Sequence, residues 1–360
     1  MKKRWKVPVF LYVGVFVLLV LAVLLFSYFQ ESRRAVERHV PIGLGGFERL
    51  ADAIVSGGPP RDGIPAVDSP RFVSAAEADA FLKDSDIVFG LVYEGVVRAY
   101  PQKVLVWHEI VNDVVAGVKL AVTYCPLTGT VLAFLRVVDG AETTFGTSGS
   151  LLNSNLVMYD RATASYWPQV LGVAVTGKQV GKRLGEVPMV WTTWGRWKAR
   201  YPQTEVLSRE TGFLRSYGSD PYGSYERDSY YTVGGPFFPV RHEDGRLPAK
   251  EVVVGLREGG DALAVAKAKV KEAGVLNLAL GEKPVLFVYD EGLDAVVVYS
   301  RLVGGKVLSF RLEGGSFVDE GGVRWSLGGV SARGRLERLP AFDAMWFAWV
   351  AFYPETELVA

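Results

Sequence analysis

The chain has 360 residues, of which 49% are hydrophobic and 22% charged, and its formal net charge is +1. This length accommodates one large or two ordinary domains, and the composition is typical of a globular protein. The nearly balanced charge excludes a strongly basic surface, so no nucleic-acid partner is expected. The 40 glycines and the 12% of aromatic residues predict many turns and a body rich in β-strands.

The N-terminus differs from this average. Four basic residues among the first six precede an uncharged run of 23 residues, 7–29, built largely from Val, Leu and Phe. Since a helix rises about 1.5 Å per residue, such a run spans a hydrocarbon core of about 30 Å. The run is longer than a signal-peptide core and no small-x-small cleavage site follows it, which favours an uncleaved transmembrane signal anchor. The basic cluster predicts that residues 1–6 are cytoplasmic and that the rest of this single-pass cell-membrane protein is extracytoplasmic.

Two parts of the chain resemble each other at a constant spacing. Four pairs of identical residues lie 165 positions apart: Gly90 and Gly255, Ala99 and Ala264, Asn112 and Asn277, and Tyr124 and Tyr289. A Trp-x-x-Trp motif at 194–197 recurs at 346–349, and Tyr-Pro-x-Thr-Glu follows in both places. A colinear series of this kind predicts an internal duplication. Because the Trp motif occurs in both copies, we interpret it as core packing rather than a ligand cage.

The duplication divides the chain into lobes. An extended lead-in at 30–84 precedes an N-terminal lobe at 85–210, and an aromatic connector at 211–249 leads to a C-terminal lobe at 250–360. The connector alternates turn formers with aromatic residues, which predicts an ordered packing loop. The predicted fold class is therefore α+β, β-rich, with two related lobes behind one N-terminal transmembrane helix.

Within the N-terminal lobe, alternating apolar segments predict two strand pairs with a short helix between them, at 87–91, 96–100, 101–107, 109–115 and 118–124. The last two strands flank Ala116-Gly117, which predicts a two-residue hairpin. The C-terminal lobe has a matching helix at 262–272 and a matching hairpin at 275–289.

Cys125 is the single cysteine of the chain, which excludes an intrachain disulfide. If Val115 pairs with Val118 across the two-residue turn, His108 stands opposite Cys125. Opposed residues have Cβ atoms about 4.5–5.5 Å apart, which lets a thiol and an imidazole interact. The C-terminal lobe has Ala273 and Asp290 at these positions. The sequence therefore predicts one site, in the N-terminal lobe only.

The same hairpin has two faces of different polarity. The face that carries His108 and Cys125 also carries Ile110, Asn112, Ala121 and Thr123. The other face carries Val111, Val115, Val118, Leu120 and Val122, and is the better core face.

An imidazole beside a thiol lowers the thiol pKa and makes the sulfur a nucleophile or a soft-metal ligand. The first functional hypothesis is a thiol-dependent enzyme with Cys125 as the nucleophile and His108 as the base. In this hypothesis Asn112 or Glu109 orients the imidazole, and the turn after Cys125 supplies backbone N–H groups to an oxyanion. Residues expected in a supporting shell are Thr123, Thr128, Asp113, Asp160 and Arg161.

Three other interpretations stay open at this stage. In the first, Cys125 and His108 bind copper or another soft ion, with a third ligand that the sequence does not name. In the second, the chain is a non-catalytic envelope protein whose aromatic connector binds a partner. In the third, Cys125 is a small buried hydrophobe and His108 a satisfied hydrogen-bonding group. Neither the substrate nor any small-molecule or protein partner is identified by the sequence.

Several motifs resemble those of the DUF3179 family, a family of unknown function. The motifs are Pro60-Arg61-Asp62-Gly63-Ile64-Pro65-Ala66-Val67-Asp68, Arg98-Ala99-Tyr100-Pro101, His108-Glu109-Ile110-Val111-Asn112-Asp113, Thr123-Tyr124-Cys125-Pro126-Leu127, Tyr159-Asp160-Arg161, Asp220-Pro221-Tyr222-Gly223-Ser224-Tyr225 and Trp346-Phe347-Ala348-Trp349. The resemblance covers most of the chain after the anchor, and it implies little about activity. Many relatives read Cys-Pro-Leu-Cys, whereas this chain has Thr128 at the second cysteine position. A two-thiolate site is therefore not expected here.

Overall fold

The structure, a computed structural model, describes residues 46–360. The predicted cytoplasmic segment (1–6) and anchor (7–29) lie outside the described residues. Within 46–360, no helix is both long enough and apolar enough to cross a membrane. Strands dominate this part of the chain, and its longest helices have seven residues. The predicted β-rich α+β class is confirmed.

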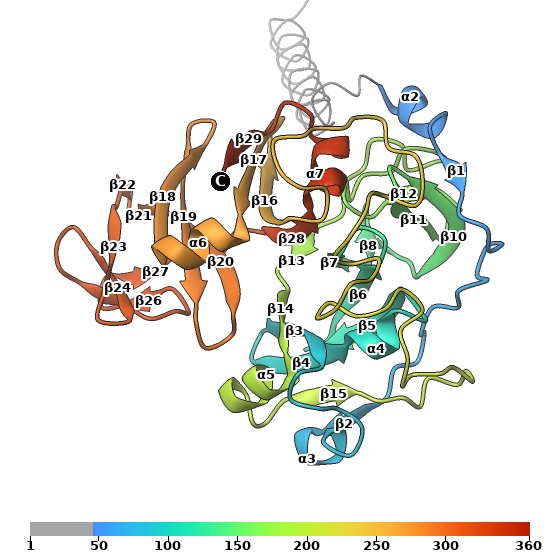
Figure 1. Cartoon of the computed structure of the whole chain (residues 1–360), viewed down its shortest axis with the longest axis horizontal. Helices are drawn as coiled ribbons and strands as arrows, with labels where there is room; N and C mark the ends of the chain where they lie inside the picture. The colour runs from blue at the N-terminus through green and yellow to red at the C-terminus, as the bar shows by residue number, and fades with distance from the viewer. Residues whose placement is uncertain (1–45) are drawn as a thin grey trace, which may run out of the picture.

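The first half of the body, residues 47–207, contains three sheets (Figure 1). The first sheet has the order β14-β3-β4-β15-β2, with strands Val190–Thr193, Ile87–Tyr93, Val96–Pro101, Glu205–Leu207 and Phe72–Ser74. The second has the order β13-β7-β6-β5, with strands Glu186–Val187, Thr130–Leu135, Val118–Cys125 and Ile110–Val115. The third has the order β1-β10-β11-β12, with strands Val55–Ser56, Phe145–Leu152, Asn155–Asp160 and Tyr166–Pro168. The lead-in thus contributes an edge strand to the first sheet (β2) and another to the third (β1).

Short elements complete this half. They are helices α2 (Phe47–Ala51), α3 (Ala75–Ala78), α4 (Gln102–Leu105) and α5 (Trp194–Arg200), and the β8–β9 hairpin (Val137–Val138 with Ala141–Glu142). Helix α4 is shorter than the predicted helix at 101–107, and Pro101 is its N-cap.

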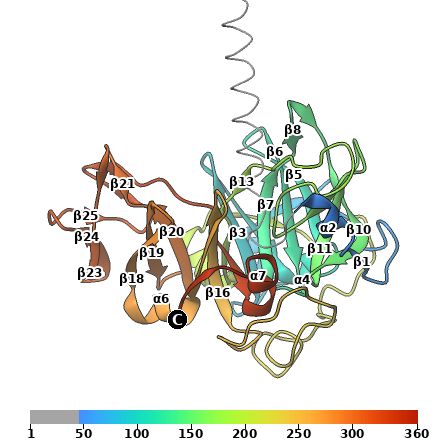
Figure 2. The same ribbon diagram turned by 90° about the horizontal axis from the view of Figure 1, so that it is seen from above.

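The second half, residues 252–359, repeats this arrangement (orange and red in Figures 1 and 2). Its first sheet has the order β28-β16-β17-β29, with strands Phe342–Met345, Val252–Glu258, Asp261–Ala266 and Glu357–Val359. Two three-stranded sheets follow: β18-β19-β20 (Val275–Leu280, Lys283–Asp290, Ala295–Ser300) and β23-β24-β25 (Phe310–Glu313, Ser316–Asp319, Arg324–Trp325). Helices α6 (Lys267–Ala273) and α7 (Trp346–Phe352) take the places of α4 and α5. The hairpins β21–β22 (Leu302–Val303 with Lys306–Val307) and β26–β27 (Val330–Ser331 with Gly334–Arg335) are the remaining strands.

Individual contacts also correspond between the halves. Trp197 lies so close to Gly90 that a Cβ added there would be 2.0 Å from the indole, and Trp349 lies equally close to Gly255. Each of these indoles donates a hydrogen bond to a threonine seven residues later, at 3.0 Å in both halves. The Trp-x-x-Trp motif is therefore core packing in both halves, as its recurrence indicated.

The predicted hairpin register is confirmed: Val115 pairs with Val118, and Leu280 pairs with Lys283 in the second half. The predicted difference between the two faces is wrong, because both faces of the β5–β6–β7 sheet are buried. Val111 and Val122 belong to one core cluster, and Ile110 to another. The core cluster that contains Ile110 lies toward β10–β12 and toward the connector.

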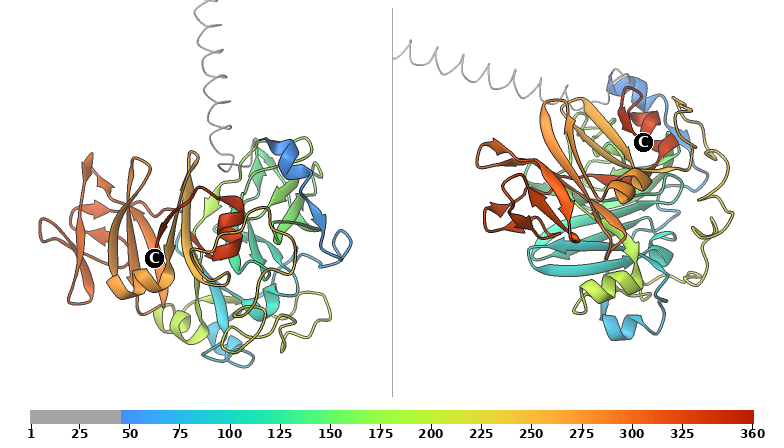
Figure 3. Two further views of the ribbon diagram at one scale, coloured as in Figure 1. Left: turned by 45° about the horizontal axis from the view of Figure 1, so that its top comes forward. Right: turned by 60° about the vertical axis from the view of Figure 1, so that its left-hand side comes forward.

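The connector has no helix or strand between 208 and 251. It crosses the first half as the yellow-to-gold chain in Figure 3. Tyr230 and Tyr231 are buried in the same core cluster as Cys125 and Trp346. The predicted packing role is confirmed for these tyrosines, whereas Val233 and Phe237 are exposed.

Candidate functional site

The structure does not place His108 opposite Cys125. The β5–β6 ladder ends where Ile110 pairs with Thr123, and Cys125 pairs only with Thr130 of β7. Glu109, just before β5, has a φ of +57°. This left-handed conformation turns the chain away from the strand direction, so the register cannot be extended from Ile110 back to His108.

The imidazole of His108 is buried and engaged elsewhere. Its Nδ1 lies 2.7 Å from the carbonyl oxygen of Pro65, and its Nε2 lies 2.6 Å from the hydroxyl of Tyr217. A carbonyl oxygen only accepts, so Nδ1 carries the proton and Nε2 accepts from the tyrosine. Burial lowers the pKa of His108, which favours this neutral form. The ring thus connects the lead-in to the connector, and neither nitrogen is directed at the thiol.

Cys125 is 1% exposed at the end of β6. Its Sγ accepts a hydrogen bond from the N–H of Leu156 at 3.3 Å and lies 3.9 Å from the carbonyl oxygen of Ser154. Burial and then the charge of Glu109 raise the pKa of the thiol to about 11, although a hydrogen bond with Thr128 acts in the opposite direction. The prediction of a lowered thiol pKa is therefore wrong.

Most of the other predicted site residues make structural contacts. Asn112 exchanges two hydrogen bonds with the backbone of Phe145, and Asn277 does the same with Phe310. Because the second half repeats it, this clamp holds the second sheet to the third and does not orient an imidazole. Asp113 accepts hydrogen bonds from Arg98 and Tyr100.

Three of the supporting residues also have structural partners. Thr123 donates to the carbonyl of Leu132 and accepts from Gln169. Asp160 accepts from the backbone N–H of Thr163 and from the indole of Trp167. Arg161 forms an ion pair with Asp68 of the lead-in, at 2.7 Å.

Glu109 is different from all of these. Its side chain is 7% exposed, and it makes no hydrogen bond or ion pair with any residue between 46 and 360. Burial raises its pKa to about 8. A carboxyl in these surroundings is protonated at neutral pH and exchanges its proton within the physiological range.

Glu109 is one of the residues that line a cavity of about 130 Å³. The walls come from the lead-in, from the β10–β11 region and from the connector. The lining residues are Gly57, Pro59, Ile64, Glu109, Leu127, Thr147, Gly149, Ser150, Leu151, Leu156, Tyr222, Phe237 and Phe238. The cavity is largely apolar with a few polar groups, a pattern typical of small-molecule sites.

The equivalent position in the second half shows which backbone conformation the fold adopts at Glu109. The counterpart of Glu109 there is Gly274, with a φ of +71°. The backbone carbonyl of each residue accepts a hydrogen bond at 2.8 Å. Glu109 accepts it from the N–H of Tyr124, and Gly274 accepts it from the N–H of Tyr289. Glycine adopts a positive φ without strain, whereas a glutamate there costs about 1 kcal/mol.

Positive φ alone does not single out Glu109. Glu94, Ala116 and Asp139 also have positive φ where the second half has Gly259, Gly281 and Gly304. Those three residues are exposed at hairpin turns. Glu109 combines the same backbone cost with burial and with the absence of a partner, and this combination is typical of functional residues.

Lys250 lies in the same aromatic region. It is 8% exposed, and its Nζ has no hydrogen-bond partner within the described part of the chain. The Nζ lies 3.3 Å from the centroid of the Tyr230 ring and 4.9 Å from that of Phe347. Burial lowers the pKa of Lys250 to about 8.

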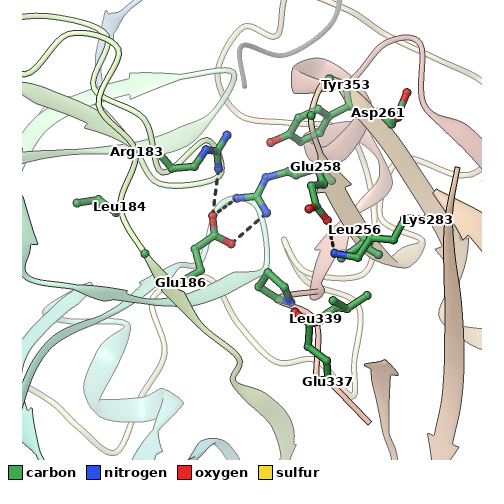
Figure 4. Close-up of a pocket in the computed structure, with 15 residues that line it drawn as sticks. Arg183, Leu184, Glu186, Leu256, Glu258, Asp261, Lys283, Glu337, Leu339 and Tyr353 are labelled. Atoms are coloured by element: carbon green, nitrogen blue, oxygen red, sulfur yellow. Dashed lines mark hydrogen bonds and ion pairs between the residues drawn. The ribbon is translucent and has the colours of Figure 1, made fainter. Parts of the chain in front are cut away.

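A second cavity, of about 320 Å³, lies between the two halves (Figure 4). Four of its charged side chains form pairs: Arg257 binds Glu186 through two hydrogen bonds, at 2.8 and 3.1 Å, and Lys283 pairs with Glu258. The pair of Arg257 and Glu186 joins the halves, whereas Lys283 and Glu258 both belong to the second half. Because these side chains already have partners, this cavity is a weaker candidate than the one beside Glu109.

The residues do not fit the predicted soft-metal site. Among residues 46–360, no three His, Cys, Asp or Glu side chains gather in a way that could hold a metal ion. The two predicted ligands, Cys125 and His108, have separate sets of partners.

The family model described as "Protein of unknown function (DUF3179)" matches residues 61–356. The chain therefore belongs to the DUF3179 family, as its motifs indicated. Comparison with curated proteins and with solved structures gives no match.

The sequence alone named Glu109 only as a partner for the imidazole, and it missed Tyr222, Phe237 and Phe238 as cavity walls. Aligning the two halves pairs Glu109 with Gly274. That pair is the sequence signal that could have indicated a left-handed position and a glutamate in an unusual place.

We expect the Cys125 thiol to react slowly in the folded protein. A pKa of about 11 leaves about a hundredfold less thiolate at neutral pH than a pKa of about 9, and burial slows access further. Iodoacetamide labelling followed by mass spectrometry should show at least this protection, and unfolding in urea should remove it. Labelling of the native protein as fast as that of a free cysteine would contradict the assignment.

Proposed function

We propose that the body is a small-molecule-binding domain in which the Glu109 carboxyl exchanges a proton with the bound molecule. The observation that carries this proposal is the buried Glu109, whose side chain has no hydrogen-bond or ion-pair partner among residues 46–360 and which is one of the residues lining a cavity. A buried acid without a partner lowers the stability of the folded state. Its presence is accounted for if a ligand supplies the missing partner.

The surroundings of Glu109 suit acid–base chemistry. Its pKa of about 8 lies close to the pH at which a general acid or base is most effective. Below that pH the carboxyl donates a hydrogen bond or a proton to the ligand, and above it the carboxylate accepts one. The Cys125 thiol and the Tyr222 phenol, which the charge of Glu109 influences, both have raised pKa values and stay neutral.

The thiol-dependent enzyme stays a prediction, and the contacts of Cys125 favour Glu109 as the reactive group instead. The copper-binding and partner-binding interpretations also stay predictions.

We further infer that the two halves derive from one duplicated unit and that only the first carries the site. The shared strand orders, the Asn112 and Asn277 clamps, and the Trp197 and Trp349 contacts support this inference. In the second half, Gly274 replaces Glu109. Asp290, at the position of Cys125, is bound by two hydrogen bonds to Arg200.

The membrane anchor at 7–29, with the body on the extracytoplasmic side, stays a proposal from the sequence. Protease added to intact cells or spheroplasts should then digest the body. Protection of the body together with cleavage of the N-terminus would reverse the proposed orientation.

Replacing Glu109 by Gln should change how stability depends on pH. The folded state holds a proton up to a pKa of about 8, whereas the ordinary value is 4.5. The folded wild type therefore retains a proton that the unfolded chain releases, and its free energy of unfolding falls as the pH rises through this window. The loss is roughly 1.4 kcal/mol for each unit of pKa difference, and E109Q should lack it.

Urea unfolding of both proteins at several pH values across this window measures the effect. The stability advantage of E109Q should be small at the acidic end and should grow toward pH 8. E94Q is the matched control, because Glu94 also has a positive φ but is exposed. Parallel curves for wild type and E109Q would show that Glu109 has an ordinary pKa.

A further inference from the structure

The cavity beside Glu109 carries an unbalanced acidic group. Glu109 is the one carboxylic acid among its lining residues, and no Lys, Arg or His lines it. If the carboxyl ionises there, its charge has no counterion among residues 46–360. A buried charge is stable only when it is paired, so the ionised form of Glu109 would be stabilised by a cation in the cavity.

Aromatic rings form the wall that the connector contributes. Tyr222, Phe237 and Phe238 line the same cavity as Glu109. Aromatic faces attract cations through the ring quadrupole, most strongly when the cation is organic and weakly hydrated. A carboxylate together with several rings is the combination that recognises an ammonium group.

The same aromatic cluster already holds one ammonium group of the protein. The Nζ of Lys250 lies over the rings of Tyr230 and Phe347 and has no hydrogen-bond partner in the described part of the chain. The Tyr230 ring is 5.8 Å from that of Tyr222 and 4.1 Å from that of Phe237. The cavity therefore continues an aromatic surface that already contacts one ammonium group of the protein.

The volume of the cavity limits the size of the ligand. At about 130 Å³, it is slightly smaller than cavities of roughly 150 Å³ that bind benzene. It accommodates an organic group of about five or six non-hydrogen atoms. Ile64, Leu151 and Leu156 present apolar surface to the part of the ligand that carries no charge.

We propose that this cavity binds a small organic ammonium ion, whose charge pairs with the Glu109 carboxylate and whose alkyl groups contact Tyr222, Phe237 and Phe238. This proposal rests on the proposed function and specifies its ligand. When the ligand binds to protein in which Glu109 is protonated, the O–H bond of Glu109 breaks and the released proton goes to solvent.

Proton release makes the affinity depend on pH. Below the pKa of Glu109, each unit of rising pH should tighten binding about tenfold, and the increase should stop near pH 8. The titratable groups whose pKa values the charge of Glu109 raises are Cys125 at the end of β6 and Tyr222 in the connector. Both are neutral in this range, so they do not alter the sign.

The test compares tert-butylammonium with tert-butanol, two probes of the same shape that differ in charge. Isothermal titration of the full chain should show that the ammonium probe binds at least tenfold more tightly than the alcohol near pH 8. The preference should shrink toward pH 6, and proton release should be measurable in buffers of different ionisation enthalpy. E109Q should abolish the preference and the proton release, and E94Q should leave both unchanged.

The possible outcomes separate this inference from the proposed function. Equal binding of both probes, or tighter binding of the alcohol, would overturn the cationic ligand and leave the small-molecule site standing. Binding of neither probe would also overturn the cationic ligand. In that case the pH dependence of E109Q stability decides whether the proposed role of Glu109 falls with it.

Discussion

The burial of the β5–β6–β7 sheet on both faces is the constraint on which the site depends. Side chains alternate between two cores, one toward the first sheet and one toward β10–β12 and the connector. A polar group in such a layer has no access to water, so it must find its partner within the protein. Thr123, Gln169 and Asn155 meet this requirement through a shared network of hydrogen bonds. The side chain of Glu109, at the margin of the same layer, has no hydrogen-bond partner among residues 46–360.

The two halves provide an internal comparison for that exception. At the position of Glu109 the second half has Gly274, which adopts the positive φ without strain. At the position of Cys125 it has Asp290, whose charge is paired with Arg200. The ion pair between Arg200 and Asp290 also links α5 of the first half to β19 of the second. The position of Glu109 in the first half thus corresponds to a glycine in the second, and the position of Cys125 corresponds to an ion-paired aspartate. The candidate site therefore lies in the first half only, where the connector contributes part of the cavity wall.

Local patterns predicted the framework well and the site poorly. The two-residue turn at Ala116-Gly117 specified the hairpin register, because turn length and strand pairing are coupled. The extension of that register to His108 failed at Glu109, whose positive φ ends the strand two residues too early. The alternation of polar and apolar residues along β5 and β6 also suggested that one face of the hairpin is polar. Apolar residues of β10–β12 and of the connector, which are distant in sequence, cover that face. The cavity could not be predicted, since its walls come from three segments that local periodicity does not bring together.

The central claim is that Glu109 is a buried acid without a partner, held protonated at neutral pH by its surroundings. A carbon-13 NMR titration of the glutamate side-chain carboxyls, with E109Q used to assign the Glu109 signal, measures its protonation directly. The account predicts a midpoint near pH 8, well above the ordinary value of 4.5. A midpoint close to 4.5 would mean that water or another partner reaches the carboxyl, and it would contradict the account.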